Sequence, residues 1–355
     1  MIAGATVRRL DRPHKPWQGC IRYSDGRRIS KVFSWQTVRT KADALKALQE
    51  WRAEVEEPSS SMPLPDYCRR YLESIGPSLE PSTVAGYGFS LAHVDELGSV
   101  PISKLTPDMV QRWESSMVSA GLSSSTVGKA HRLLKQVLRH AVDCGDLDRN
   151  PCCAVRPPKR RAPHPNALDS DGRARLVGLL DSMGECPLRT AAYIALLTGM
   201  RRGEVCALRW DDFDWDSMEV RVRRSVGIGR GGAYLKDVKT DAGVRSIPVT
   251  ERLRTAVRPS QGYVLGGGTF YNPTRLGKQW SSFAASFGII GTEGRVCTFH
   301  DLRHTYATVA IAGGADVRSV ASILGHASAS MTLNVYAAAD RSATRRAAEL
   351  ASGSI

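Results

Sequence analysis

The sequence predicts a multidomain protein that is mainly α-helical and carries small β-sheets. The chain has 355 residues, which is more than one ordinary hydrophobic core holds together. Two stretches with the composition of linkers, 58–63 and 156–165, contain proline and divide the chain into three segments. Strand-like patterns occur near the N-terminus and at about 218–249, whereas the other segments have helical spacing of their apolar residues.

The first segment, residues 1–57, is predicted to form a three-stranded sheet plus a helix. Residues 17–23 and 29–35 are strand-like, and an Asp-Gly pair between them is a strong hairpin signal. From residue 41 to residue 56, apolar side chains recur at the spacing of one helix face.

The sheet end of this segment is basic, with ten Lys or Arg and two Asp in its first 41 residues. A basic sheet can lie in a DNA groove, and Arg22, Arg27 and Lys31 are the predicted contacts. The alternative is a small folded appendage with a solvated basic face.

The second segment, residues 64–155, is predicted to be all helical. The expected helices cover 64–75, 82–97, 107–117 and 123–144, and Thr106 followed by Pro107 is a typical helix start. The last helix is rich in basic side chains, among them His131. We predict that it tracks DNA phosphates through Lys129, Arg132, Lys135 and Arg139. A solvated helix face is the alternative.

The second linker is cationic and stiffened by proline. Lys159, Arg160 and Arg161 are predicted to contact DNA, because a basic linker between two basic domains suits a clamp around a duplex. The whole chain has a formal charge of +14, and its pI is about 9.6. Such a charge favours polyanionic partners, nucleic acid first, although ribosomal and membrane-surface proteins share this balance.

Several classes of protein are disfavoured by composition. There is no apolar run approaching ~18 residues and no signal-peptide pattern, so we expect a cytoplasmic protein without a membrane partner. The eight cysteines form no C-x-x-C pair, which is typical of reduced thiols and not of a disulfide framework or zinc site.

The third segment, residues 166–355, carries five short signals in a fixed order. They are T-G-M-R-R-G-E at 198–204, K-T at 239–240, H-D-L-R at 300–303, L-G-H at 324–326, and Tyr336. A DNA phosphodiester resists attack, so an enzyme must stabilise charge on the phosphate, position a nucleophile and protonate the leaving 5′-oxygen. Arginine forks suit the first task, and the candidates are Arg201 and Arg303.

The other residue types fit the remaining tasks. A lysine such as Lys239, expected at a hairpin tip, can give a proton to the leaving oxygen. His300 and His326 can bond a phosphate oxygen or exchange protons near neutral pH. Tyr336 is a weak nucleophile unless a cationic site favours its phenolate form. Each residue taken alone is more often structural, and the ordered combination is what favours chemistry.

The ordered set resembles the tyrosine recombinase, or phage integrase, family. The resemblance covers about 166–350 with high specificity, and more weakly 64–155 as a helical core-binding (SAM-like) domain and 1–57 as an arm-type DNA-binding domain. It implies an α+β catalytic domain whose catalytic residues are Arg201, Lys239, His300, Arg303, His326 and the nucleophile Tyr336. Glu204 would not take part in the chemistry itself but would support the catalytic residues through its contacts with them. Arg202 and His304 are ambiguous neighbours.

The resemblance also implies a mechanism and partners. A 3′-phosphotyrosyl intermediate would retain the bond energy, so neither ATP nor a metal cofactor is expected. A homotetramer would act on double-stranded attachment sites of core and arm types, at the nucleoid of a bacterial host. A directionality factor and a host DNA-bending protein are plausible partners. The chain would integrate or excise a prophage or mobile element.

Other interpretations remain open. They are a conjugative-transposon integrase, a non-cleaving regulator of the same fold, a type IB topoisomerase and a chromosome-dimer resolvase. The spacing of His300 and His304 matches a zincin pair, but an arginine lies between them and no third ligand is evident. The G-x-G-x-x-G at 227–232 precedes a strand and not a helix, so we predict a glycine-rich hairpin.

Overall fold

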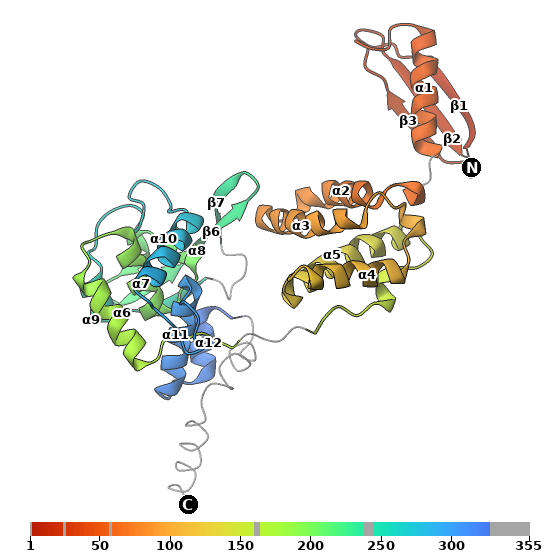
Figure 1. Cartoon of the computed structure of the whole chain (residues 1–355). Coiled ribbons are helices and arrows are strands. Elements are labelled where there is room, and N and C mark those ends of the chain that lie inside the picture. Colours follow the sequence, from red (N-terminus) through yellow and green to blue (C-terminus); the bar gives the residue numbers. More distant parts are fainter. Residues whose placement is uncertain (1, 24–25, 57–58, 160–163, 238–243, 327–355) are drawn as a thin grey trace, which may run out of the picture. The chain divides into compact units, whose positions relative to one another are not determined.

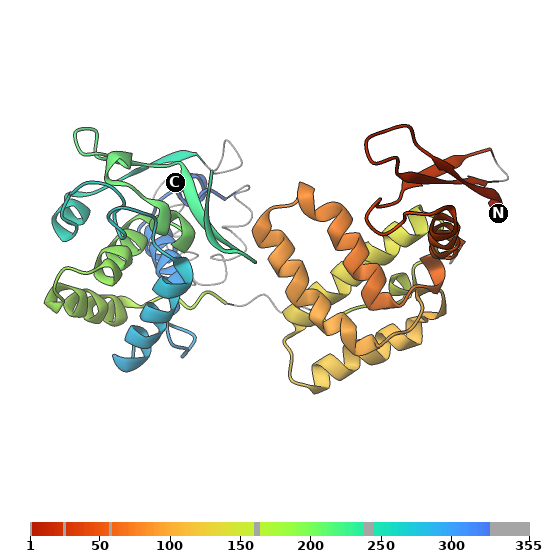
Figure 2. The same ribbon diagram turned by 90° about the horizontal axis from the view of Figure 1, so that it is seen from above.

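The N-terminal region, residues 2–56, is an antiparallel three-stranded sheet with one helix packed on it. The computed structural model describes residues 2–23, 26–56, 59–159, 164–237 and 244–326. The strands are β1 (Ile2–Arg9), β2 (Trp17–Tyr23) and β3 (Arg28–Val32), in the order β1-β2-β3, and the helix is α1 (Lys41–Glu56) (Figure 1). The helix covers one face of the sheet, as Figure 2 shows, and their shared core contains Ile21, Phe33 and Leu48. The predicted sheet-plus-helix arrangement is confirmed.

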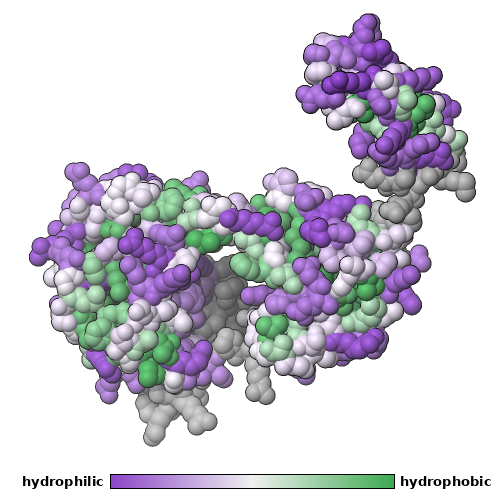
Figure 3. All heavy atoms as spheres, turned by 45° about the horizontal axis from the view of Figure 1, so that its top comes forward, coloured by the Kyte–Doolittle hydropathy of each residue, from purple (hydrophilic) through white to green (hydrophobic). Residues whose placement is uncertain are grey.

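The two faces of this sheet differ because side chains alternate along each strand. Ile21 faces the helix, and Lys31 lies on the same side, with its Nζ 5.9 Å from the centre of the Trp51 ring. Arg22 lies on the opposite face, where the strand register places it beside Arg28, and Arg8 follows further along β1. Much of the visible surface of this region is hydrophilic (Figure 3).

The helical region contains four α-helices, with short 3₁₀ turns between some of them and at both ends of the region. The helices are α2 (Leu64–Ile75), α3 (Pro81–Val94), α4 (Pro107–Ser119) and α5 (Ser124–Asp143). The 3₁₀ turns are Ser59–Ser61, Gly76–Ser78, Asp95–Leu97, Ile102–Lys104 and Pro151–Ala154. The predicted start at Thr106 is confirmed, since its hydroxyl accepts a hydrogen bond from the Met109 backbone N–H at 3.3 Å. Trp113, Met117 and Leu134 belong to its core.

One expectation for α5 is wrong. His131 is buried, 3% exposed, and bonds Glu114 of α4, so it does not belong to the basic surface. A buried polar group needs such a partner. The residues of this helix that are predicted to contact DNA, Lys129, Arg132, Lys135 and Arg139, are exposed. At about 100° per residue they share roughly one third of the helix circumference.

The C-terminal region is mixed, with helices around small antiparallel sheets. Its helices are α6 (Ser170–Ser182), α7 (Pro187–Thr198), α8 (Arg202–Ala207), α9 (Glu251–Ala256), α10 (Pro273–Ser286), α11 (Phe299–Ala312) and α12 (Val317–Leu324), with a 3₁₀ turn at Trp210–Asp212. Its strands are β4 (Phe213–Asp214), β5 (Glu219–Val222), β6 (Arg224–Gly229), β7 (Gly232–Asp237) and β8 (Arg245–Pro248). The largest core of the described residues lies here and includes Trp280, Ile194 and Leu302.

The strands form two separate sheets. One has the order β4-β5-β8, and the other is the hairpin β6-β7, with Gly229 paired to Gly232 at its end. The predicted glycine-rich hairpin is therefore confirmed.

The residue contacts divide the chain into two units, residues 1–79 with 86–160, and residues 80–85 with 161–355. The finer domain boundaries given above stay predictions.

Candidate active site

Arg201 lies at the turn between α7 and α8. Helix α7 ends at Gly199, which has the left-handed conformation (φ 66°) that glycine adopts at least cost. A Cβ at Gly199 would lie 2.7 Å from both Tyr306 and Leu324, so this turn packs tightly against α11 and α12. Arg201 then begins α8 as its N-terminal cap, and its backbone N–H donates to Glu204 Oε2 at 2.8 Å.

The guanidinium of Arg201 is held by two acceptors. Its Nη1 donates to Glu204 Oε1 at 2.9 Å, and its Nη2 donates to the Gly325 carbonyl at 2.7 Å. The Arg201 side chain is nevertheless 40% exposed, whereas that of Glu204 is 3% exposed. The arrangement fixes the direction of the arginine and leaves its charge accessible from outside.

Arg303 lies in the first turns of α11, which begins with a Thr298–Asp301 capping box. It is 3% exposed. Its Nη1 donates to the Gly199 carbonyl and its Nη2 to the Leu324 carbonyl, both at 2.8 Å. Arg303 therefore ties the turn before Arg201 to the end of α12.

The end of α12 is where the separate motifs meet. Gly325 terminates the helix in the left-handed conformation, and His326 follows directly. The carbonyls of Leu324 and Gly325 accept from Arg303 and Arg201 respectively. Cations are favoured at a helix C-terminus, where the carbonyls lack helical partners. The structure thus brings Arg201, Arg303 and His326 together, as expected of a phosphate-binding site.

His300 lies in the first turn of α11 and is exposed. Its ring centre is 4.8 Å from that of His304, edge to face. Although the residue as a whole is exposed, partial loss of water around its ring is the first cause that lowers its pKa to about 4, and His304 and Arg303 are the next. The pKa of His326 is also lowered to about 4, by burial first and then by Arg303 and Arg201. Both rings are therefore neutral at pH 7 and can offer one donor and one acceptor each.

Glu204 keeps its charge despite being buried. Burial acts to raise the pKa of Glu204, but hydrogen bonds and charge from Arg245, and then from Arg201, lower it below its usual range. Because Glu204 stays ionised, both of its carboxylate oxygens can accept hydrogen bonds from the arginines and so orient Arg201.

Two predicted catalytic residues, Lys239 and Tyr336, lie outside the described residues, as do Arg160 and Arg161 of the basic linker. The expectation that the strands flanking Lys239 form one hairpin is wrong. Strand β7 pairs with β6, whereas β8 pairs with β5, so the two flanking strands belong to different sheets. Lys159 is described and is exposed.

Arg245 is a residue of this site that the motifs did not identify. It lies on β8, is 9% exposed and bonds both oxygens of Glu204. The sequence did contain one signal. Arg245 is two positions before Ile247 in a strand, so the two side chains face the same, inward side of the sheet.

Of the two ambiguous neighbours, His304 packs against His300 within the site, whereas Arg202 does not join it. Arg202 lies against α10, where a Cβ at Gly277 would overlap its Nη1. Within the described residues, no group of three or more His, Cys, Asp or Glu is arranged to hold a metal ion.

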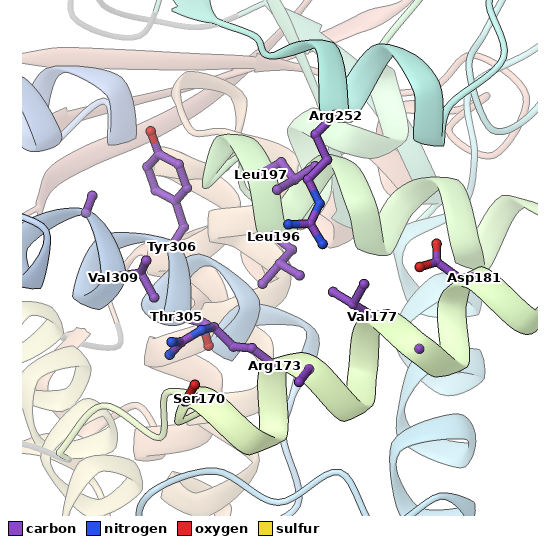
Figure 4. Close-up of a pocket in the computed structure, with 13 residues that line it drawn as sticks. Ser170, Arg173, Val177, Asp181, Leu196, Leu197, Arg252, Thr305, Tyr306 and Val309 are labelled. Atoms are coloured by element: carbon purple, nitrogen blue, oxygen red, sulfur yellow. The ribbon is translucent and has the colours of Figure 1, made fainter.

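A cavity of about 770 Å³ opens elsewhere on this unit. Its walls come from α6, α7, α11 and the start of α9, with Val177, Leu196 and Tyr306 among the lining side chains (Figure 4). None of the described catalytic candidates lines it. The cavity is therefore not where the predicted chemistry takes place.

Comparison with known proteins agrees with the resemblance that the ordered motifs indicate. Residues 167–343 match the Phage integrase family. The tyrosine recombinase XerC-like protein of Caldanaerobacter subterraneus subsp. tengcongensis is 25% identical over 68% of this chain and 69% of its own length. The tyrosine recombinase XerC of Chromobacterium violaceum is 26% identical over 77% of this chain and 89% of its own length.

Solved structures share the fold at low identity. The Tn1549 transposon integrase, in complex with a circular intermediate DNA, has a TM-score of 0.68 and 22% identity over 81% of this chain and 99% of that one. A lambda integrase dimer bound to a COC′ core site has a TM-score of 0.63 and 17% identity over 93% of this chain and 96% of that one. The match of its C-terminal half and its similarity to these relatives establish that the chain belongs to the phage integrase family of tyrosine recombinases, enzymes that cleave and rejoin DNA at specific sites.

Proposed function

We propose that the protein is the integrase of a prophage or mobile element. The observation that carries the proposal is the convergence of Arg201, from a turn, and Arg303, from α11, on adjacent carbonyls beside His326. Tyr336 follows ten residues later in the sequence. Two guanidinium groups and two neutral histidines can stabilise the charge that develops on a phosphate during attack.

The proposed reaction is transesterification through the tyrosine. The Tyr336 oxygen attacks the scissile phosphorus, forming a P–O bond to the 3′ side of the break and releasing the 5′-oxygen. Lys239 gives that oxygen its proton. The 5′-hydroxyl of a partner strand then attacks the phosphotyrosine, releases the tyrosine and restores a phosphodiester. One bond forms for each that breaks, so the cycle needs no external energy source.

The N-terminal region favours an integrase over a XerC-type role. The XerC of Chromobacterium violaceum aligns with 77% of this chain, whereas lambda integrase shares the fold over 93%, a span longer than residues 58–355 alone. We propose that residues 1–57 bind arm-type sites and that the rest binds core-type sites. On the sheet, Arg22 would contact DNA together with Arg8 and Arg28, which share its exposed face. We withdraw the contact expected at Lys31, because Lys31 lies on the face that α1 covers.

A conjugative-transposon integrase is the second candidate. It is favoured by the likeness to the Tn1549 integrase, whose fold matches 99% of that chain. The two candidates carry out the same strand exchange and differ in the element whose ends they join. Sequencing the junctions formed in the host, with and without the gene, separates them.

The partners follow from the same proposal. One lambda integrase structure of this fold is a tetramer bound to a Holliday junction. We propose a homotetramer on two duplexes for this chain, assisted by a directionality factor and a host DNA-bending protein. Within the described residues, none of the helices has the length and apolarity needed to cross a lipid bilayer.

The test is recombination between candidate attachment sites cloned from the DNA flanking the gene. Wild-type protein should recombine a pair of sites that carry both core and arm sequences. Protein lacking residues 1–57 should still cleave the core site but lose integrative recombination. Equal recombination by the two proteins would remove the proposed arm-binding role.

A further inference from the structure

We propose that Arg245 is a positioning residue of the active site. It acts on Arg201 through Glu204, and it acts on His326 through the end of α12. This inference rests on the proposed function and adds a residue to its machinery.

Arg245 is a charge placed where a strand normally has an apolar side chain. In β8, Arg245 and Ile247 are buried while Ser246 and Pro248 are exposed. Arg245 pairs with Val222 of β5, so its backbone is fixed within the sheet. A buried cation costs free energy unless it is fully bonded, which indicates that its partners are specific.

The first partner is the carboxylate of Glu204. Arg245 Nη1 donates to Oε1 at 3.1 Å, and Arg245 Nη2 donates to Oε2 at 2.8 Å. Arg201 bonds the same two oxygens, through its Nη1 and its backbone N–H. Each oxygen of Glu204 thus accepts from both arginines, so the carboxylate has one orientation. That orientation in turn sets the direction of the Arg201 guanidinium.

The second partner is the end of α12. Arg245 Nε donates to the Ile323 carbonyl at 2.6 Å. Because Arg303 bonds the Leu324 carbonyl and Arg201 bonds the Gly325 carbonyl, three consecutive carbonyls are each bonded by a different arginine. The three arginines come from a strand, a helix and a turn. Together they fix the last turn of α12, from which His326 emerges.

Gly325 shows how closely Arg245 approaches this turn. A Cβ at Gly325 would lie 3.0 Å from Arg245 Nη1 and 3.2 Å from its Cζ. Gly325 also has φ 64°, which disfavours other residues. The glycine of the L-G-H motif is therefore required both by its own backbone and by the arginine packed on it.

A second buried arginine–carboxylate pair in the C-terminal region, Arg224 with Asp212, provides a control for a purely stabilising role of Arg245. Arg224 of β6 donates from Nη2 to both oxygens of Asp212, at 2.6 and 2.7 Å. Asp212 is 4% exposed, much like Glu204. Among the described residues, Asp212 accepts from the Arg209 backbone N–H and from Arg224, and not from Arg201, Arg303 or His326. Breaking this pair removes a buried Arg–carboxylate contact without touching the site.

The experiment compares Arg245→Lys and Arg245→Met with Arg224→Lys and Arg224→Met in the full chain. Thermal unfolding gives the folded fraction, a core-site duplex gives Kd, and a nicked core-site duplex at saturation gives the single-turnover rate of covalent adduct formation. We expect both pairs to lose thermal stability. Only the Arg245 variants should lose rate, by about 100-fold per folded protein, with Kd changed less than about threefold, because small misplacements of catalytic groups have effects of this size. If Arg245→Met does not fold, Arg245→Lys decides.

A double-mutant comparison with Glu204 distinguishes a positioning role of Arg245 from a purely structural one. In a Glu204→Gln background, Arg245→Lys should cost less than about threefold in rate, because the two residues act as one unit. Equal rates for Arg245→Lys and Arg224→Lys per folded protein would overturn the inference, and so would full additivity with Glu204→Gln. If wild-type protein forms no adduct, the proposed function itself fails, and the inference fails with it.

Discussion

The N-terminal sheet and the C-terminal region, residues 164–237 and 244–326 and called the catalytic unit below, use arginine in opposite ways. On the sheet, Arg8, Arg22 and Arg28 are exposed on the face away from α1. In the catalytic unit, Arg245 and Arg303 are buried, and their donors go to carbonyls and to one carboxylate. The sheet presents charge to the outside, whereas the catalytic unit uses charge to fix its own geometry.

This difference teaches what each region tolerates. Exposed cations bind a polyanion largely through release of counterions, so one is partly replaceable by another. A buried arginine that donates to particular carbonyls cannot be replaced by a cation elsewhere, and removing it leaves several polar groups without that donor. We therefore expect graded effects of substitution in the sheet and abrupt effects in the catalytic unit.

The largest effect is expected at the two arginines of the candidate site. Arg201→Ala should lower the single-turnover rate of adduct formation by about 10³-fold or more, because a donor to the developing charge is lost. Arg303→Ala should lose a similar factor and also lower the unfolding midpoint, since it leaves the Gly199 and Leu324 carbonyls without this donor. Rates are compared per folded protein. Normal rates in either variant would show that the site is wrongly assigned.

An intermediate effect is expected from the two faces of the N-terminal sheet. Arg22→Gln should weaken binding of the full chain to an arm-site duplex by about tenfold, a typical value for one DNA contact. Lys31→Gln removes the same charge from the helix-covered face and should change binding by less than about threefold. Gel-shift titrations measure both, with a core-site duplex as the control. Equal losses would mean that net charge matters and the face does not.

Salt dependence sharpens the same contrast. The slope of log K against log salt for arm-site binding should become shallower by about one in Arg22→Gln, because one phosphate contact is lost. In Lys31→Gln the slope should stay close to that of wild type. Fluorescence anisotropy over a range of salt concentrations provides the measurement, and two unchanged slopes would argue against a phosphate contact at Arg22.

The smallest effect concerns pH and stability. Partial burial together with Arg303 and Arg201 holds the pKa of His326 at about 4, below the value of about 6.5 expected when unfolded. The unfolded chain therefore binds more protons between these values, so stability is fully present above pH 6.5 and declines as pH falls towards 4. His326→Gln should flatten the dependence of the unfolding midpoint on pH, with His164→Gln as the exposed control. An unchanged profile would contradict the neutral assignment.

Local features of the fold were predictable from sequence because their causes are local. Thr106 and Ser123 begin helices, as predicted, through bonds to residues three positions ahead. Gly199 and Gly325 end helices in the left-handed conformation that glycine adopts at least cost. The same holds for the hairpin at Gly229–Gly232, whose glycines lie within one short turn.

Features set by distant contacts were not predictable. Arg245 bonds residues 41 and 78 positions away, and its inward phase alone does not name those partners. His131 seemed to belong to a basic helix face until its partner Glu114, on another helix, was known. The strands around Lys239 pair with others because strand pairing is decided by the whole sheet.

The most direct test of the account is covalent trapping on nicked duplexes tiled across the DNA that flanks the gene. Wild-type protein and Tyr336→Phe are incubated with each duplex in EDTA and without ATP. The account predicts a protein–DNA adduct with wild type only, at one site, linked through a 3′-phosphate. Site-specific binding without an adduct, or an adduct that persists in Tyr336→Phe, would contradict it.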